Sequence, residues 1–514
     1  MTTASPPASI HLFDAGYDNI LGEVVRHWLQ SPHSPETFSL HQDTTSLLLQ
    51  GAYSQEVPLE LPQPAYGHSK DHRPDLKQLI FGVSLQGKTG VPCAGMVFDG
   101  NTSDAFANRY HLEEFASRLP EPDKVTIVAD SKLVDAITLG RLLDEGFHFV
   151  SLLSNNFNLR QQLIDRTCAE EAPLPELRRQ PGRRKSDPPR LWHGRSYLRG
   201  FQVVDPQTGV RQARTLRFVV VHSSQLTARF EKGLARRLKK DAEGLKKAVR
   251  ALTKQSFSCA ADAQAMLTRT APSATYHDVT WSVVVQEVAL PFPGRGRPHK
   301  GQKRPTKIVW KLDAGPLTLK ASAIETARRR ASHFVLVSDH LPSPAWSDAR
   351  LLAEYRQQSE IEGYTGFRWL KGPAAITPIF LKKPARIAAL GLIFLLALMV
   401  RNVVQFWLRQ ALERDDGTVE GRNRKQTARP TTEAAFAHFQ GVSLVQVVHS
   451  MGEVIVSRHL TGVTHNTRRI LELLDVDLEV FTTPKPLPDR KSLPPTQGGP
   501  EMRDLLPASS YMLL

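Results

Sequence analysis

Apolar and polar positions change period several times in the first part of the chain, and the changes predict alternating strands and helices. The spacing predicts strands over FSLHQDTTSLLL, LKQLIFGVSLQGKTGVPCAGMVF (a hairpin turning at 87–90), KVTIVAD and FHFVSLL. It predicts helices over SDAFANRYHLEEFASRL and LVDAITLGRLLDEG. Hairpin-linked strands followed by strand, helix and strand are typical of a mixed α/β sheet.

The pattern changes near residue 154, where a basic, Pro-rich stretch is followed by further short strands and a cationic helix. We expect an inserted β-rich domain there, reaching to residue 332. The α/β pattern then resumes with HFVLVSD and a helix. The apolar run 387–400 has 14 residues, fewer than the roughly 20 of a membrane span, and Arg386 and Arg401 flank it. The run therefore predicts a buried core helix, and no membrane partner.

The net charge of the chain indicates a class of binding partner. The 514-residue chain has a formal net charge of +15 and a pI of about 9.7, which favours a polyanionic partner, with nucleic acid ahead of acidic lipid. A basic enzyme without such a partner is the alternative. The three cysteines lack CxxC spacing, which argues against a disulfide framework and a zinc site. No secretory signal is visible, so we expect a soluble, cytoplasmic protein.

Two carboxylates occupy unusual positions in the predicted sheet. Asp43 lies within a strand, where an ionised group is costly unless it is paired or binds a cation. Asp130 ends a buried strand, where open α/β sheets place ligands, although helix capping would also explain it. With a third carboxylate, the two would suit a pair of Mg²⁺ ions for phosphodiester chemistry.

Five short blocks carry a resemblance to a known family. They are DTTS, GHSKDHRPDLKQ, FDGNTSD, IVADSKL and the Tyr…Glu…Phe-Arg-Trp-Leu-Lys segment before the apolar helix. In this order they resemble the DDE transposases of bacterial insertion sequences, over residues 36 to 480. That family has an RNase H-like core split by a β-rich insertion between the second Asp and the Glu.

The resemblance implies a function and a site. Asp43, Asp130 and Glu362 would hold two Mg²⁺ ions, for which Mn²⁺ can substitute, and Asp71, Asp75, Asp104 and Asp339 would not. The enzyme would hydrolyse the phosphodiester at the element ends and transfer the 3′-hydroxyl into target DNA. Its partner would be double-stranded DNA, meaning the terminal inverted repeats and the target, bound by a homodimer. The alternatives are an RNase H-like nuclease without strand transfer and an inactive DNA-binding relic.

Basic residues in several segments are candidates for DNA contacts. Lys70, His72 and Arg73 could hold phosphates, or belong to a solvated connection; Tyr355, Arg368 and Lys371 would position DNA by the resemblance; Arg295 and Arg297 form an Arg-Gly-Arg-Pro core that suits a minor groove or a flexible phosphate-binding loop. The helix around 236–247 could track a DNA backbone or be a solvated face.

The segment AEYRQQSEIEGYTGFRWLKGP contains three glutamates, which helix geometry separates. Tyr355 and Glu362 are seven residues apart and share a face, whereas Glu360 and Glu354 are expected to be surface charges. Glycines in GYTG predict a helix break just after Glu362 that brings Arg368 or Lys371 back toward DNA.

The expected organisation has six parts. They are an N-terminal segment (1–35), the first part of the core (36–153), the insertion (154–332), the second part of the core (333–413), a C-terminal helical region (414–482) and a disordered Pro-rich tail (483–514).

Overall fold

The computed structural model describes most of the chain between residues 17 and 483. The described ranges are 17–53, 61–103, 106–107, 109–110, 121–182, 184, 186–292, 303–360, 366–372, 379–421, 424–448 and 455–483.

A nine-stranded mixed sheet is the centre of the molecule, in the order β3-β2-β1-β4-β5-β11-β8-β7-β6. Its first half consists of β1 (Phe38–Leu48), β2 (Gln78–Gln86), β3 (Pro92–Phe98), β4 (Val125–Ala129) and β5 (His148–Leu152). Strands β1, β2 and β3 are antiparallel neighbours, while β4 runs parallel to β1 and β5 parallel to β4. The strands predicted from alternation are present, and the expected mixed α/β class is confirmed.

The second half of the sheet comes from β11 (His333–Ser338), β8 (Arg211–Ser223), β7 (Arg190–Val204) and β6 (Glu176–Gln180). All of these strands pair antiparallel. Three of them, β6 to β8, fall inside the stretch expected to be a separate insertion. They instead continue the sheet of the core, because β11 pairs with β5 on one side and with β8 on the other.

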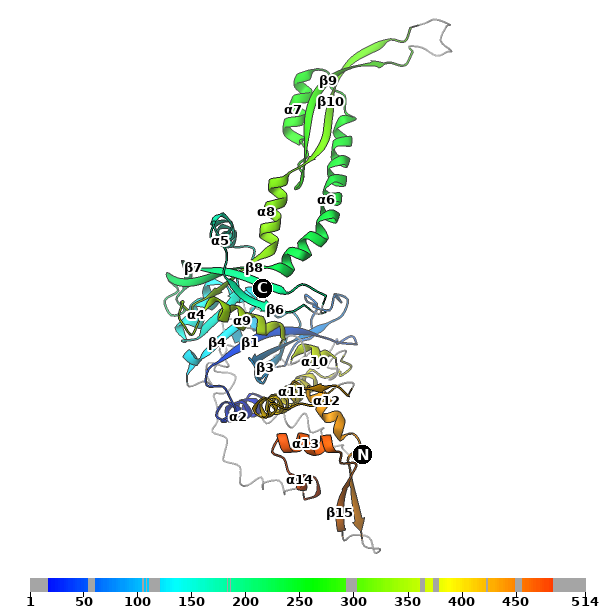
Figure 1. Cartoon of the computed structure of the whole chain (residues 1–514). Coiled ribbons are helices and arrows are strands. Elements are labelled where there is room, and N and C mark those ends of the chain that lie inside the picture. Colours follow the sequence, from blue (N-terminus) through cyan, green and yellow to red (C-terminus); the bar gives the residue numbers. More distant parts are fainter. Residues whose placement is uncertain are drawn as a thin grey trace.

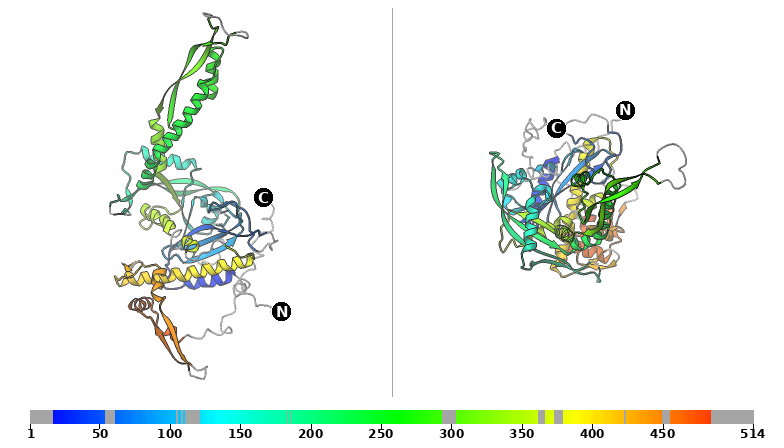
Figure 2. Two further views of the ribbon diagram at one scale, coloured as in Figure 1. Left: turned by 90° about the vertical axis from the view of Figure 1, so that its right-hand side faces the viewer. Right: turned by 90° about the horizontal axis from the view of Figure 1, so that it is seen from above.

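The rest of that stretch forms a long arm, which projects away from the sheet in Figure 1 and Figure 2. The arm contains α6 (Ser224–Thr253), α7 (Ala260–Thr270), β9 (His277–Ala289), β10 (Thr306–Leu319) and α8 (Ala321–Ser332). Strands β9 and β10 form a two-stranded ribbon, and Leu252, Ala263 and Leu312 make a small core between the ribbon and the helices.

Helices cover both parts of the sheet. They are α2 (Tyr17–Leu29), α4 (Ala136–Asp144), α5 (Asn158–Ala169), α9 (Asp348–Glu360), α10 (Phe367–Lys371) and α11 (Pro384–Arg414), with 3₁₀ turns η1 (Pro122–Lys124) and η2 (Ser131–Leu133). The predicted helix at 103–119 falls mostly outside the described residues.

The apolar helix α11 is longer than the predicted run, 31 residues instead of 14. Its length and composition would allow it to cross a membrane, but 56% of its most apolar window is buried within the protein. Leu395 lies close to Gly95 of β3, where an added Cβ would come within 2.7 Å of it. The Asn402 amide donates to the Gly90 carbonyl, 2.6 Å away. This packing agrees with the predicted core helix.

The C-terminal region is not helical throughout. It contains β12 (Val419–Glu420), β13 (Gln426–Thr427), α12 (Thr432–Phe436), η5 (Ala437–Phe439), β14 (Ser443–Val448), β15 (Ile455–Thr461), α13 (His465–Leu473) and α14 (Glu479–Thr482). Leu408 and Leu412 of α11 pack against Ile470 of α13, so this region has its own small core.

Candidate functional site

The register of two parallel strands brings Asp43 and Asp130 together. His41 of β1 is the partner of Val128 of β4. Asp43 lies two residues after His41, and Asp130 lies two residues after Val128. Neighbouring strands lie about 4.8 Å apart, so the two carboxylates project from adjacent backbones. Asp130 directly follows the carboxyl end of β4, where open α/β sheets place ligands, and Asp43 lies beside it in the middle of β1.

Helix α9 covers the face on which these carboxylates lie. Residues two apart on a strand share a face, so Asp43 lies on the face of His41, and Asp130 on that of Val128. Val128 packs with Leu351 and Leu352 of α9 in one buried cluster.

The far end of α9 reaches β1. A Cβ at Gly87 would lie 3.0 Å from Gln357 Oε1 and 3.2 Å from His41 Nε2, so Gln357 lies beside β1. The helix thus runs across the strands and leads toward Glu362, which is outside the described residues.

The two carboxylates differ in their partners. The Asp43 Oδ1 atom accepts from the Thr44 amide at 2.7 Å and lies 3.3 Å from Lys70 Nζ; the Asp43 side chain is 36% exposed. The Lys70 ammonium also donates to the Thr44 carbonyl. Asp130 is exposed, and its Oδ1 accepts from the Lys132 amide at 3.0 Å, which caps η2. Capping therefore explains part of the role of Asp130, as the alternative allowed.

These donors fit Mg²⁺. Two carboxylates at a solvent-accessible edge offer the hard oxygen ligands that Mg²⁺ prefers, with space for the waters that it keeps.

Lys371 lies at the same edge as Asp43. Its ammonium pairs with the Asp71 carboxylate at 2.7 and 2.8 Å, and Asp71 follows Lys70 directly. Helix α9 ends at Glu360 and α10 begins at Phe367, with Gly366 in a turn between them. The helix is therefore not continuous through Lys371, because it is interrupted at Gly366, the last residue of GYTG. The position just after Glu362, where the break is predicted, lies outside the described part of the chain.

The other candidate DNA contacts lie in varied surroundings. The Arg73 guanidinium pairs with Asp75, 2.7 Å away at the surface, and His72 has a backbone φ of +57°. The partly buried Tyr355 packs near Phe334, with ring centroids 6.5 Å apart. Arg368 lies in α10, but its side chain is outside the described residues, as are Arg295 and Arg297.

The expectation that Glu354 is a surface charge is wrong. The residue is only 4% exposed, and its Oε1 atom pairs with Arg350 Nε at 2.7 Å. The ion pair one turn earlier on α9 compensates the buried charge, which the helical angle alone did not reveal.

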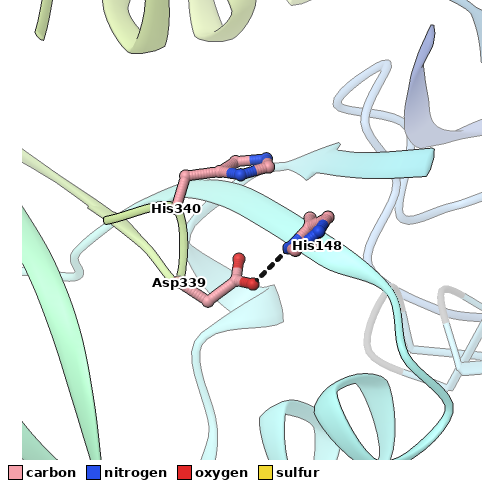
Figure 3. Close-up of side chains that lie close together, drawn as sticks. All are labelled: His148, Asp339 and His340. Carbon is pink, nitrogen blue, oxygen red and sulfur yellow. Dashed lines mark hydrogen bonds and ion pairs between the residues drawn. The ribbon is translucent and has the colours of Figure 1, made fainter. Parts of the chain in front are cut away.

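A second group of polar residues lies at the opposite edge of the sheet, where β4 and β5 begin. Figure 3 shows its three side chains close together. His148 begins β5, and Asp339 and His340 follow β11 directly. One ligand atom from each of the three lies within 4.8 Å of the other two. The His148 Nδ1 atom is 2.6 Å from Asp339 Oδ2, and the Phe149 amide donates to Asp339 Oδ1 at 2.8 Å.

The pKa values of the two histidines in this group are shifted in opposite directions. The hydrogen bond to Asp339 raises the pKa of His148, while burial lowers the pKa of His340 to about 4. His340 Nε2 is 2.9 Å from Thr126 Oγ1, and its ring stacks on Trp346 at 3.5 Å.

Little in the sequence indicated this group. His148 and the pair Asp339–His340 are 191 residues apart, and only the pairing of β5 with β11 joins them. The one available signal was the position of each just outside or at the start of an apolar strand.

No protein-family model matches this chain, and no curated protein matches it.

Proposed function

We propose that this protein is a DNA transposase of the DDE type, which hydrolyses the phosphodiester at the ends of an insertion sequence and transfers the 3′-hydroxyl into target DNA. The β1–β4 register carries the proposal, since it sets Asp43 and Asp130 side by side at one edge of the sheet.

The order and directions of the first five strands support an RNase H-like core. In that fold an antiparallel three-stranded unit is followed by two strands parallel to the first, as in the order β3-β2-β1-β4-β5 seen here. The helix that packs on β4 and leads to Glu362 has the place that the resemblance assigns to the third carboxylate.

The residues would divide the work by their chemistry. Asp43, Asp130 and Glu362 would hold Mg²⁺, or Mn²⁺ in its place. When bound, the ions supply Lewis-acid stabilisation of the charge that develops on the phosphate. Lys70 and Lys371 lie beside this edge and would exchange their carboxylate partners for DNA phosphates. We further propose that a homodimer assembles on the DNA, in the cytoplasm.

The test is a cleavage and joining assay on DNA that carries the inverted repeats flanking the coding sequence, with Mg²⁺ or Mn²⁺. Asp43→Asn, Asp130→Asn and Glu362→Gln should each lower cleavage at least about 100-fold, since each removes a metal ligand. The matched control is Asp144→Asn, an exposed carboxylate on α4 away from this edge.

Three outcomes are informative. Cleavage and joined products that depend on all three carboxylates support the transposase. Cleavage without joined products would identify a nuclease instead. Undiminished cleavage by Asp130→Asn would overturn the proposed site.

A further inference from the structure

The group formed by His148, Asp339 and His340 has the composition and arrangement of a metal site distinct from the one proposed above. It lies where β4 and β5 begin, whereas Asp130 follows the end of β4 and Asp43 lies beside it in the middle of β1. From Thr126 to Asp130 the chain advances four residues along β4, about 13 Å. The two groups are therefore separated by the length of a strand and share no ligand.

We propose that His148, Asp339 and His340 bind one Zn²⁺ ion. Two imidazoles and one carboxylate are a ligand set that suits zinc better than Mg²⁺, which prefers oxygen ligands throughout. A tetrahedral Zn²⁺ with bonds of about 2.0–2.1 Å requires its ligand atoms to be about 3.3 Å apart. The three ligand atoms already lie within 4.8 Å of one another, so small side-chain rotations bring them to that separation.

The neighbours of these side chains orient them as the partners of zinc ligands usually do. A zinc-bound histidine uses its other ring nitrogen for a hydrogen bond that fixes the ring. Here Thr126 Oγ1 holds Nε2 of His340, and stacking on Trp346 fixes the plane of the ring, which leaves Nδ1 for the metal. The Phe149 amide similarly holds one oxygen of Asp339, and the other oxygen is directed at His148 (Figure 3).

The ligands also differ in accessibility, in a way that allows an ion to enter. The side chain of His148 is 37% exposed and that of Asp339 is 13% exposed, while His340 is 7% exposed. Water can therefore reach the site from the side of His148 and fill the fourth position. The cysteines, whose spacing argued against zinc, take no part: Cys93 is buried elsewhere and Cys259 lies in the arm.

An ion at this place would tie the segment that follows β11 to the edge of β5. The same segment begins α9, because Trp346, which stacks on His340, is two residues before Asp348. The ion would therefore stabilise the entry to α9 by coordinating residues of two strands that are 191 residues apart in sequence.

The experiment uses the full-length protein after removal of metal with a chelator. Zn²⁺ is titrated in by calorimetry, and Co²⁺ is added in parallel as a spectroscopic probe. We expect one equivalent of Zn²⁺ to bind, an absorption spectrum of tetrahedral Co²⁺, and a rise in melting temperature with Zn²⁺. His148→Ala should weaken Zn²⁺ binding at least about 10-fold and abolish the rise in melting temperature.

Further variants keep the test decisive. His27→Ala, which removes an exposed histidine of α2, is the matched control and should bind zinc as the unaltered protein does. Asp43→Asn should also retain the zinc site, which separates this proposal from the proposed function. His148 is on the surface side of the group, so its removal should leave the metal-free fold intact, and circular dichroism checks this.

Two results would overturn the proposal. One is that the unaltered protein binds no Zn²⁺. The other is that His148→Ala binds Zn²⁺ as tightly as the unaltered protein does. In either case the three residues are a hydrogen-bonded cluster only.

Discussion

The start of α9 depends on one buried cation, and its removal gives the sharpest prediction for stability. Arg217 of β8 is 2% exposed. Its Nη1 atom donates to the Trp346 carbonyl at 2.5 Å, and its Nη2 atom to Asp348 Oδ1 at 2.5 Å. We expect Arg217→Met to fill much of the same space while removing both hydrogen bonds and the charge.

The magnitude follows from what is left behind. Breaking a buried ion pair by removing one partner costs about 3–5 kcal/mol, because the remaining charge is uncompensated. The Asp348 side chain is 21% exposed, so water recovers part of that cost. We therefore expect the lower end, about 3 kcal/mol, which is roughly a 100-fold change in the unfolding equilibrium.

Urea unfolding measures the free energy, and hydrogen exchange shows where it is lost. The amides of α9 should exchange faster in Arg217→Met, since the helix loses its anchor. The control is Arg179→Met, whose partner Glu176 is a surface residue 2.6 Å away. Exposed pairs contribute little, so no measurable change is expected. If Arg217→Met unfolds like this control and α9 exchanges as before, the reasoning about the anchor is refuted.

Two further predictions concern packing and pH. Gly140→Ala should destabilise the protein by about 1–3 kcal/mol or more, since its Cβ would lie 1.8 Å from the Val204 carbonyl oxygen, whereas Gly244→Ala, in open space within α6, should stabilise it by about 0.5–1 kcal/mol; thermal unfolding of both variants tests the pair. Burial and the adjacent His333 and His193 lower the pKa of His222 to about 4, so its contribution to stability is present above pH 6.5 and is lost as the pH falls toward 4. His222→Asn, with His27→Asn as control, should therefore lose less stability between pH 7 and pH 5 in urea unfolding, and an unchanged loss would contradict the assigned role.

The elements of the core followed from local pattern, but the extent of its sheet did not. The pattern of apolar residues located β1 to β5, because each strand buries one or both faces and its buried positions carry apolar side chains. The pairing of β11 with both β5 and β8 depends on hydrogen bonds between backbones far apart in sequence. Composition marked residues 154–332 as different, which is true of the arm, but it carries no information about which strands join an existing edge.

The candidate site, too, was predictable from the sequence only in part. Asp43 and Asp130 were recognisable because a carboxylate in or at the end of an apolar strand needs a physical reason. The partners around them were not: Lys70 was noted as a possible phosphate contact, yet its ammonium lies against Asp43. Side-chain partners of this kind are decided by tertiary packing, as the buried Glu354 also shows.

The two proposed sites meet through a single helix. Helix α9 begins beside His340, where Trp346 and Arg217 hold its entry, and it ends beside His41 on β1, two residues before Asp43. A packed helix transmits a shift at one end to the other, because its interior hydrogen bonds resist local deformation. If zinc binds at one edge of the sheet, helix α9 is therefore the element that would carry its effect to Asp43 and Asp130 at the other edge.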